Sequence, residues 1–77
     1  MKKEIFLRKI DNLCDLEPGT LVGNEVLKHL SFWDSLMVLG FLSLVDKDFN
    51  VILSPVDVTN ALTVNDLIKL LGDRIQE

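Results

Sequence analysis

Hydrophobic residues recur along most of this chain at intervals of three and four positions, the spacing of one face of an α-helix. The first set predicts a helix from about residue 2 to residue 14, before the turn-forming sequence Glu17-Pro18-Gly19. The members of this set are Phe6, Leu7, Ile10, Leu13 and Cys14.

A second helix is predicted between Asp34 and Asn50. Asp34 has the short acceptor side chain that caps a helix start, and Asn50 suits the left-handed position at a helix end. The apolar stripe of this helix consists of Val38, Phe41, Leu42, Val45 and Phe49. Residues 51–53 could form a strand, but no second strand is available to pair with them, so we expect none.

Two further helix starts follow in quick succession. Ser54-Pro55-Val56-Asp57 combines a capping residue, a proline and an acid, which predicts a short helix that ends near Asn60. Thr63-Val64-Asn65-Asp66 repeats the capping signal and predicts a last helix to about Gln76. Its apolar face consists of Val64, Leu67, Ile68, Leu71 and Ile75. The predicted fold is all-α, a four-helix bundle with a short third helix.

Residues 20–32 lack a clean period and predict a long loop between the first two helices. Connections of this length in compact domains are more often functional than accidental. We expect its apolar residues to pack onto the core, namely Leu21, Val22, Val26, Leu27 and Leu30. The predicted helical core itself consists of Phe6, Ile10, Phe41, Leu42, Val45, Phe49, Val64, Leu67 and Leu71.

The length and composition narrow the class of protein. A chain of 77 residues, 48% of them apolar, predicts a single globular domain over residues 1–77. Such a domain is too small to surround a deep catalytic cleft, so we do not expect an enzyme. The net charge of −4 disfavours nucleic acid and anionic membranes, and favours partners with basic surfaces.

The single cysteine and the short apolar runs indicate a cytoplasmic protein. Cys14 is the only cysteine, which excludes an internal disulfide and an ordinary cysteine zinc site, so no metal is expected. The longest apolar run, residues 36–45, is too short to cross a bilayer. Near the N-terminus, charged residues follow the short apolar run 5–7 at once, so no signal peptide develops.

Ser35 is the candidate for chemistry, because it follows the long loop at the first turn of a helix. Its hydroxyl should be accessible and close to unpaired backbone N–H groups, although nothing nearby would activate it. Taken alone, Asp34 and Ser35 are more typical of ordinary capping residues at a helix start. His29 could be imagined in a triad with Ser35, but no oxyanion site is evident. We expect Cys14 in the core.

Trp33-Asp34-Ser35-Leu36 resembles the Asp-Ser-Leu signature of acyl and peptidyl carrier proteins. Trp33 could pack the loop onto the helices or face the carried group and partner proteins, and we expect packing. Three later segments are similar to this family's end of the second helix, its short third helix and the start of its last helix. They are Phe49-Asn50-Val51, Ser54-Pro55-Val56-Asp57-Val58 and Ala61-Leu62-Thr63-Val64-Asn65-Asp66-Leu67.

The resemblance implies that a phosphopantetheinyl transferase moves 4′-phosphopantetheine from coenzyme A onto Ser35, between the flanking Asp34 and Leu36 of the signature. The thiol of that arm would hold an acyl or aminoacyl group as a thioester. The implied partners are this transferase, an acyl- or aminoacyl-loading enzyme and a downstream synthase or transferase. The resemblance also implies a four-helix bundle of acyl-carrier type, which we expect to be monomeric and to have no catalytic residues of its own.

The chain departs from carriers of fatty-acid synthesis in the second helix, where Met37 and Gly40 stand at positions that are usually acidic. This departure favours a specialised biosynthetic pathway. With the apolar stripe turned inward, we expect a docking face for partners at Leu36, Met37, Gly40 and Leu44. The alternative function is an unmodified protein-interaction module of the same fold, although such a module has no reason to keep Asp34-Ser35-Leu36 intact.

Overall fold

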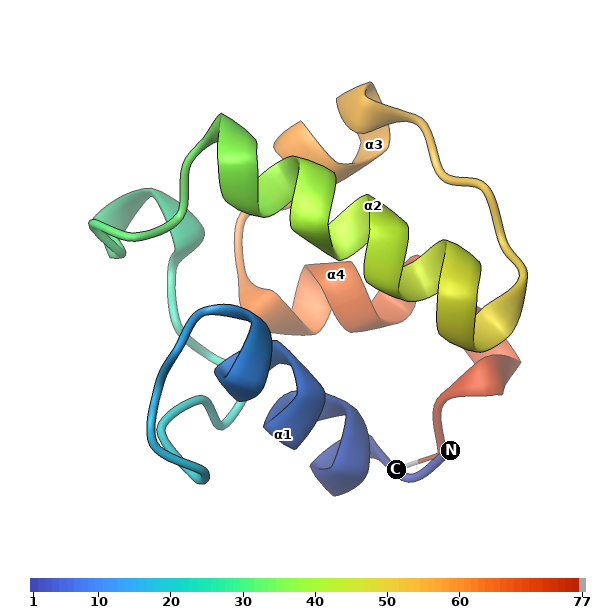
Figure 1. Ribbon diagram of the computed structural model, residues 1–77, viewed down its shortest axis with the longest axis horizontal. Coiled ribbons are helices and arrows are strands. Elements are labelled where there is room, and N and C mark those ends of the chain that lie inside the picture. The colour runs from blue at the N-terminus through green and yellow to red at the C-terminus, as the bar shows by residue number, and fades with distance from the viewer. Residues whose placement is uncertain (77) are drawn as a thin grey trace.

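The computed structural model describes residues 1–76, and over this range the protein is helical without strands. Its α-helices are α1 (Lys3–Leu13), α2 (Ser35–Phe49), α3 (Pro55–Thr59) and α4 (Val64–Lys69), shown in Figure 1. Short 3₁₀ turns lie at Leu27–His29 and Gly72–Arg74. The all-α prediction is confirmed, as is the absence of a strand at residues 51–53. The predicted single domain extends to Glu77, which lies outside the described residues.

Local side-chain contacts start three of the helices where the sequence predicts. The Asp34 carboxylate accepts a hydrogen bond of 3.0 Å from the Met37 amide at the start of α2. Ser54 caps α3, and Thr63 with Asp66 forms a reciprocal capping box at α4. Asn50 ends α2 with φ of 56°, the left-handed conformation expected of it.

The last helix is shorter than predicted, because α4 ends at Lys69 and not near Gln76. Gly72 adopts a φ of +55°, which turns the chain away from the helix axis. The chain then pairs with its own beginning, since the Gln76 carbonyl accepts from the Lys3 amide at 2.7 Å and the Gln76 amide donates to Met1 O at 2.7 Å. The two ends of the described chain therefore lie side by side (Figure 1).

The core lies between α2 and the other helices, and α2 contacts both α1 and α3. Seven of the nine predicted core residues are buried. The other two, Leu42 and Phe49, are half-buried and pack against the core. Edge-to-face contacts join four aromatic rings in the order Trp33, Phe41, Phe6 and Phe49, with centroid separations of 6.3, 6.1 and 5.6 Å. We call these four side chains the aromatic row.

The loop between α1 and α2 is held by a buried acid that the sequence analysis did not single out. Asp11 is fully buried on α1 and accepts hydrogen bonds from the Gly19 amide at 2.9 Å and the Leu21 amide at 3.0 Å. Arg8 donates to the same carboxylate at 2.9 Å and to the Leu21 carbonyl at 2.7 Å. Leu21 is thereby drawn into the core, as predicted.

The other apolar residues of this loop have mixed outcomes. Leu27 is buried, and Leu30 is half-buried against the core, as predicted. Val22 is 60% exposed, so its predicted packing is wrong. Its backbone explains the difference, because the Val22 and Gly23 amides both donate to the Glu25 carboxylate in a tight local turn. Among residues 1–76, no helix is long and apolar enough to cross a membrane.

Candidate functional site

Ser35 is the first residue of α2, and its side chain is exposed. Within residues 1–76, no other group forms a hydrogen bond with the Ser35 hydroxyl. The carboxylate of Asp34 is turned to the Met37 amide, so it caps the helix and does not act as a base for Ser35. The amides of the first helical turn face the same region, as they do at every helix start. The hydroxyl is therefore open to modification from outside.

A surface hollow of about 320 Å³ lies beside Ser35 and joins the start of α2 to the end of α3. Its lining combines apolar and polar side chains, namely Leu27, Lys28, Trp33, Asp34, Ser35, Val38, Thr59 and Ala61. Trp33 is half-buried, and its ring meets Phe41 edge to face, so its predicted packing role is confirmed. The hollow therefore has a floor formed by side chains that also belong to the core.

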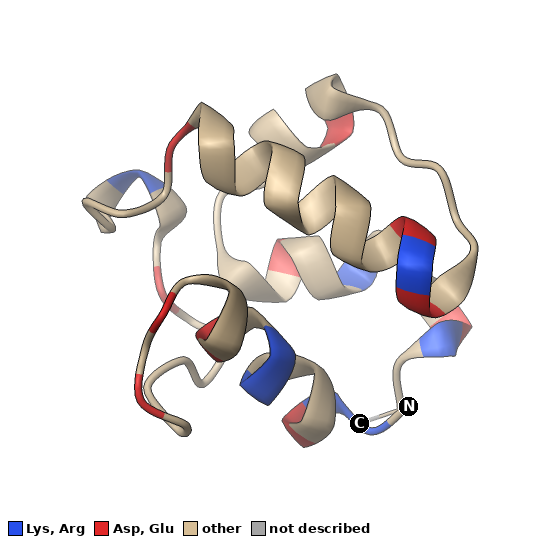
Figure 2. Ribbon diagram, in the orientation of Figure 1, with Lys and Arg blue, Asp and Glu red and all other residues tan. Residues whose placement is uncertain are grey.

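Charge is scarce around this site. From Ser35 to Val45 α2 has no charged residue, and Figure 2 shows acidic and basic positions only in its last turns. Asp34 and Lys28 bring one negative and one positive charge to the hollow. The surface next to Ser35 on α2 is therefore apolar.

The predicted docking residues do not all face outward. Leu36 is 66% exposed, but Met37 and Leu44 are half-buried and pack against the core. At Gly40 a Cβ atom would lie 3.0 Å from Leu13 Cδ1, so this position faces α1 and not solvent. The expectation that Met37, Gly40 and Leu44 face outward is therefore corrected, because α1 packs closer to this side of α2 than the helical wheel alone indicates.

Leu39 is the exposed apolar residue of α2 that the sequence analysis missed. Its side chain is 59% exposed, and it follows Leu36 by three positions on the same side of the helix. That spacing was visible in the sequence. The interval of three residues between Leu36 and Leu39 does not by itself indicate exposure, because leucines at helical intervals usually belong to the core.

The other candidate groups do not join Ser35. His29 is exposed in the 3₁₀ turn, and within the described part of the chain it makes no hydrogen bond to Ser35. Cys14 is buried in the core as predicted, where burial, and secondly the negative charge of Asp11, raises the pKa of its thiol. Residues 1–76 contain no group of three or more His, Cys, Asp or Glu side chains that could hold a metal ion.

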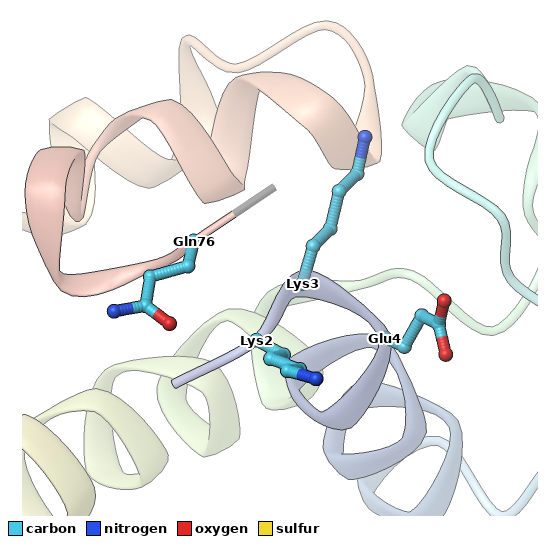
Figure 3. Close-up of a pocket in the computed structure, with 4 residues that line it drawn as sticks. All are labelled: Lys2, Lys3, Glu4 and Gln76. Carbon is cyan, nitrogen blue, oxygen red and sulfur yellow. The ribbon is translucent and has the colours of Figure 1, made fainter.

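A second hollow, of about 490 Å³, lies where the two ends of the chain meet and is lined by Lys2, Lys3, Glu4 and Gln76. Figure 3 shows that these side chains point in different directions and do not converge on a common centre. Binding sites need polar groups that converge on a ligand. Ser35 and the hollow beside it therefore remain the better candidate.

Comparisons with known proteins assign no family. No family model matches the chain, and neither the curated proteins nor the solved structures contain a significant match. A functional proposal therefore depends on the geometry around Ser35 and on the resemblance of its motif.

Proposed function

We propose that this protein is an acyl carrier protein of the four-helix-bundle type, with Ser35 as the attachment point of 4′-phosphopantetheine. The observation that carries the proposal is the position of Ser35 in Asp34-Ser35-Leu36, exposed at the first turn of α2 with no hydrogen bond to its hydroxyl from residues 1–76. A serine that only caps a helix would precede the helix and bond an amide, and here Asp34 performs that function.

The groups around Ser35 fit a phosphodiester. The free amides of the first turn and the dipole of α2 favour a negative group there, by about 0.3–1 kcal/mol at an exposed position. The hollow beside Ser35 offers apolar and polar surface to the rest of the arm. When attached, the arm supplies a thiol that holds acyl or aminoacyl groups as thioesters.

The modification needs a separate enzyme, because no group placed to act as a base reaches Ser35. A phosphopantetheinyl transferase would bind the carrier together with coenzyme A. The Ser35 Oγ–phosphorus bond then forms as the diphosphate bond of coenzyme A breaks, adenosine 3′,5′-bisphosphate leaves, and the transferase takes the hydroxyl proton. A loading enzyme and a downstream synthase or transferase would bind the modified carrier, in a cytoplasmic, specialised biosynthetic pathway.

Intact mass spectrometry tests the proposal directly. Incubation with coenzyme A and a broad-specificity phosphopantetheinyl transferase should add one phosphopantetheine to the wild type. Ser35→Ala should remain folded and unmodified, whereas Ser43→Ala, which removes another exposed hydroxyl of α2, should be modified like the wild type. An unmodified wild type with several transferases, or a modified Ser35→Ala, contradicts the proposal.

The alternative is an unmodified interaction module, and the exposed leucines of α2 favour it. Leu36 and Leu39 are both more than half exposed on a surface without charge, which is a feature of protein-binding sites as well. The same mass measurement separates the two functions, since the alternative requires that Ser35 stay unmodified.

A further inference from the structure

We propose that this carrier holds a small cargo at its surface and does not enclose a long alkyl chain in its core. The inference rests on the proposed function and adds the class of substrate. It starts from the side chains that lie between Ser35 and the centre of the domain.

The centre of the domain is closed even to water. Six core side chains have an exposed fraction of 0%, so no space large enough for a water molecule touches them: Phe6, Phe41, Val45, Val58, Leu67 and Leu71. An alkyl chain is as wide as a water molecule or wider, so it could enter only if these side chains moved apart. The core therefore has no ready channel for it.

The aromatic row blocks the route from Ser35 to this centre. Trp33 lies at the floor of the hollow and packs edge to face on Phe41, with an angle of 68° between the rings. Phe41 meets Phe6 at 70°, and Phe6 meets Phe49 at 70°. Rigid rings in mutual contact cannot yield by a rotation about a terminal bond as methionine or leucine side chains can. A chain that entered beside Ser35 would have to displace Trp33 and Phe41 together.

The space beside Ser35 that can take cargo is the hollow described above. Its volume of about 320 Å³ is at the lower end of the range for small-molecule sites, and the arm would occupy part of it. Most of its lining surface is apolar, and Lys28, Asp34 and Thr59 add polar groups. A long alkyl chain would extend beyond the hollow and leave much of its surface in water, whereas a short acyl or aminoacyl group would not.

The test compares carriers loaded with acetyl and octanoyl groups, each transferred to Ser35 with its phosphopantetheine from the corresponding acyl coenzyme A. We expect the two loaded forms to melt within about 2 °C of each other, because neither group enters the core. In methyl NMR spectra the octanoyl form should shift signals of Val38 and Ala61, and leave those of Val45, Leu67 and Leu71 unchanged. A Tm higher by about 4 °C or more for the octanoyl form, with shifted core methyls, overturns the inference.

Trp33→Ala gives a matched variant in which the floor of the hollow is removed. If Trp33 is the barrier, the octanoyl form of this variant should melt above its acetyl form, and equal melting would overturn that role. The wild-type comparison decides the proposal even if the variant does not fold. The outcomes also separate the two proposals: a wild type that accepts neither group overturns the carrier function, whereas stabilisation by octanoyl overturns only the small cargo.

Discussion

Gly40 of α2 lies against Leu13 of α1, so closely that a Cβ atom at Gly40 would be 3.0 Å from Leu13 Cδ1. A glycine within a helix costs about 0.5–1 kcal/mol relative to alanine. Here the missing side chain lets α1 approach α2, so the glycine has a structural reason.

We expect Gly40→Ala to stabilise the protein less in the wild-type background than in a Leu13→Ala background. With Leu13 truncated, the added methyl has room, and the variant should gain about 0.5–1 kcal/mol of helix propensity. With Leu13 present, the close contact cancels part of that gain. Urea unfolding of the four proteins gives the coupling energy, expected to be about 0.5 kcal/mol or more. Ser43→Ala, an exposed position of α2, should have the same effect in both backgrounds.

Asp11→Ala should destabilise the protein strongly. It removes the acceptor for the Leu21 and Gly19 amides and for Arg8, and the buried Leu21 amide alone should cost about 1–3 kcal/mol when left unpaired. Asp11→Asn keeps one acceptor oxygen and should cost less. Glu17→Ala removes an exposed acid from the same loop and should change the free energy of unfolding by under about 0.5 kcal/mol. A small effect of Asp11→Ala in chemical denaturation would contradict this account of the loop.

Stability should fall in acid because two carboxylates bond backbone amides. Burial alone would raise the pKa of Glu25, but hydrogen bonds from the Val22 and Gly23 amides outweigh it and lower that pKa. Hydrogen bonds from the Leu62 and Thr63 amides lower the pKa of Asp66. A carboxyl with a lowered pKa in the folded state adds stability above its ordinary pKa, and this is lost as protonation proceeds.

The free energy of unfolding should therefore decrease as the pH falls below about 4, the ordinary range of these groups. Unfolding measured in urea between neutral pH and pH about 3 checks this slope. Glu25→Gln and Asp66→Asn should each flatten the curve, because each removes one titrating group. If the free energy of unfolding of the wild type does not fall with pH, or if neither variant changes that slope, these hydrogen bonds do not contribute to the loss of stability in acid.

Under the proposed function, the exposed leucines beside Ser35 should contribute to recognition by the phosphopantetheinyl transferase. Leu36→Ala and Leu39→Ala remove apolar contact without adding charge, so we expect KM for the carrier to rise by about tenfold with little change in kcat. Val22→Ala, at an exposed valine outside α2, should leave KM unchanged. Added salt should raise KM only mildly. If KM instead rises steeply with added salt and neither leucine variant changes it, acidic residues are responsible for recognition.

Local signals in the sequence were enough to place the starts of α2, α3 and α4. Asp34, Ser54 and Thr63 act within three residues of their own position, so each signal is complete in a short segment of the chain. The same locality holds for Asn50, whose left-handed conformation ends α2. The position of Ser35 at the first turn of α2 follows directly from the capping residue before it.

Which side of α2 is free depends on contacts with other segments of the chain. Helical spacing puts Gly40 outside the apolar stripe, but the approach of Leu13 from α1 covers it. Nothing near Asp11 in the sequence reveals that the amides of Gly19 and Leu21 fold back to it. The pairing of Gln76 with the first residues likewise shortens the last helix. Each of these contacts joins different segments of the chain, so its energy depends on the packed fold and is absent from any local pattern.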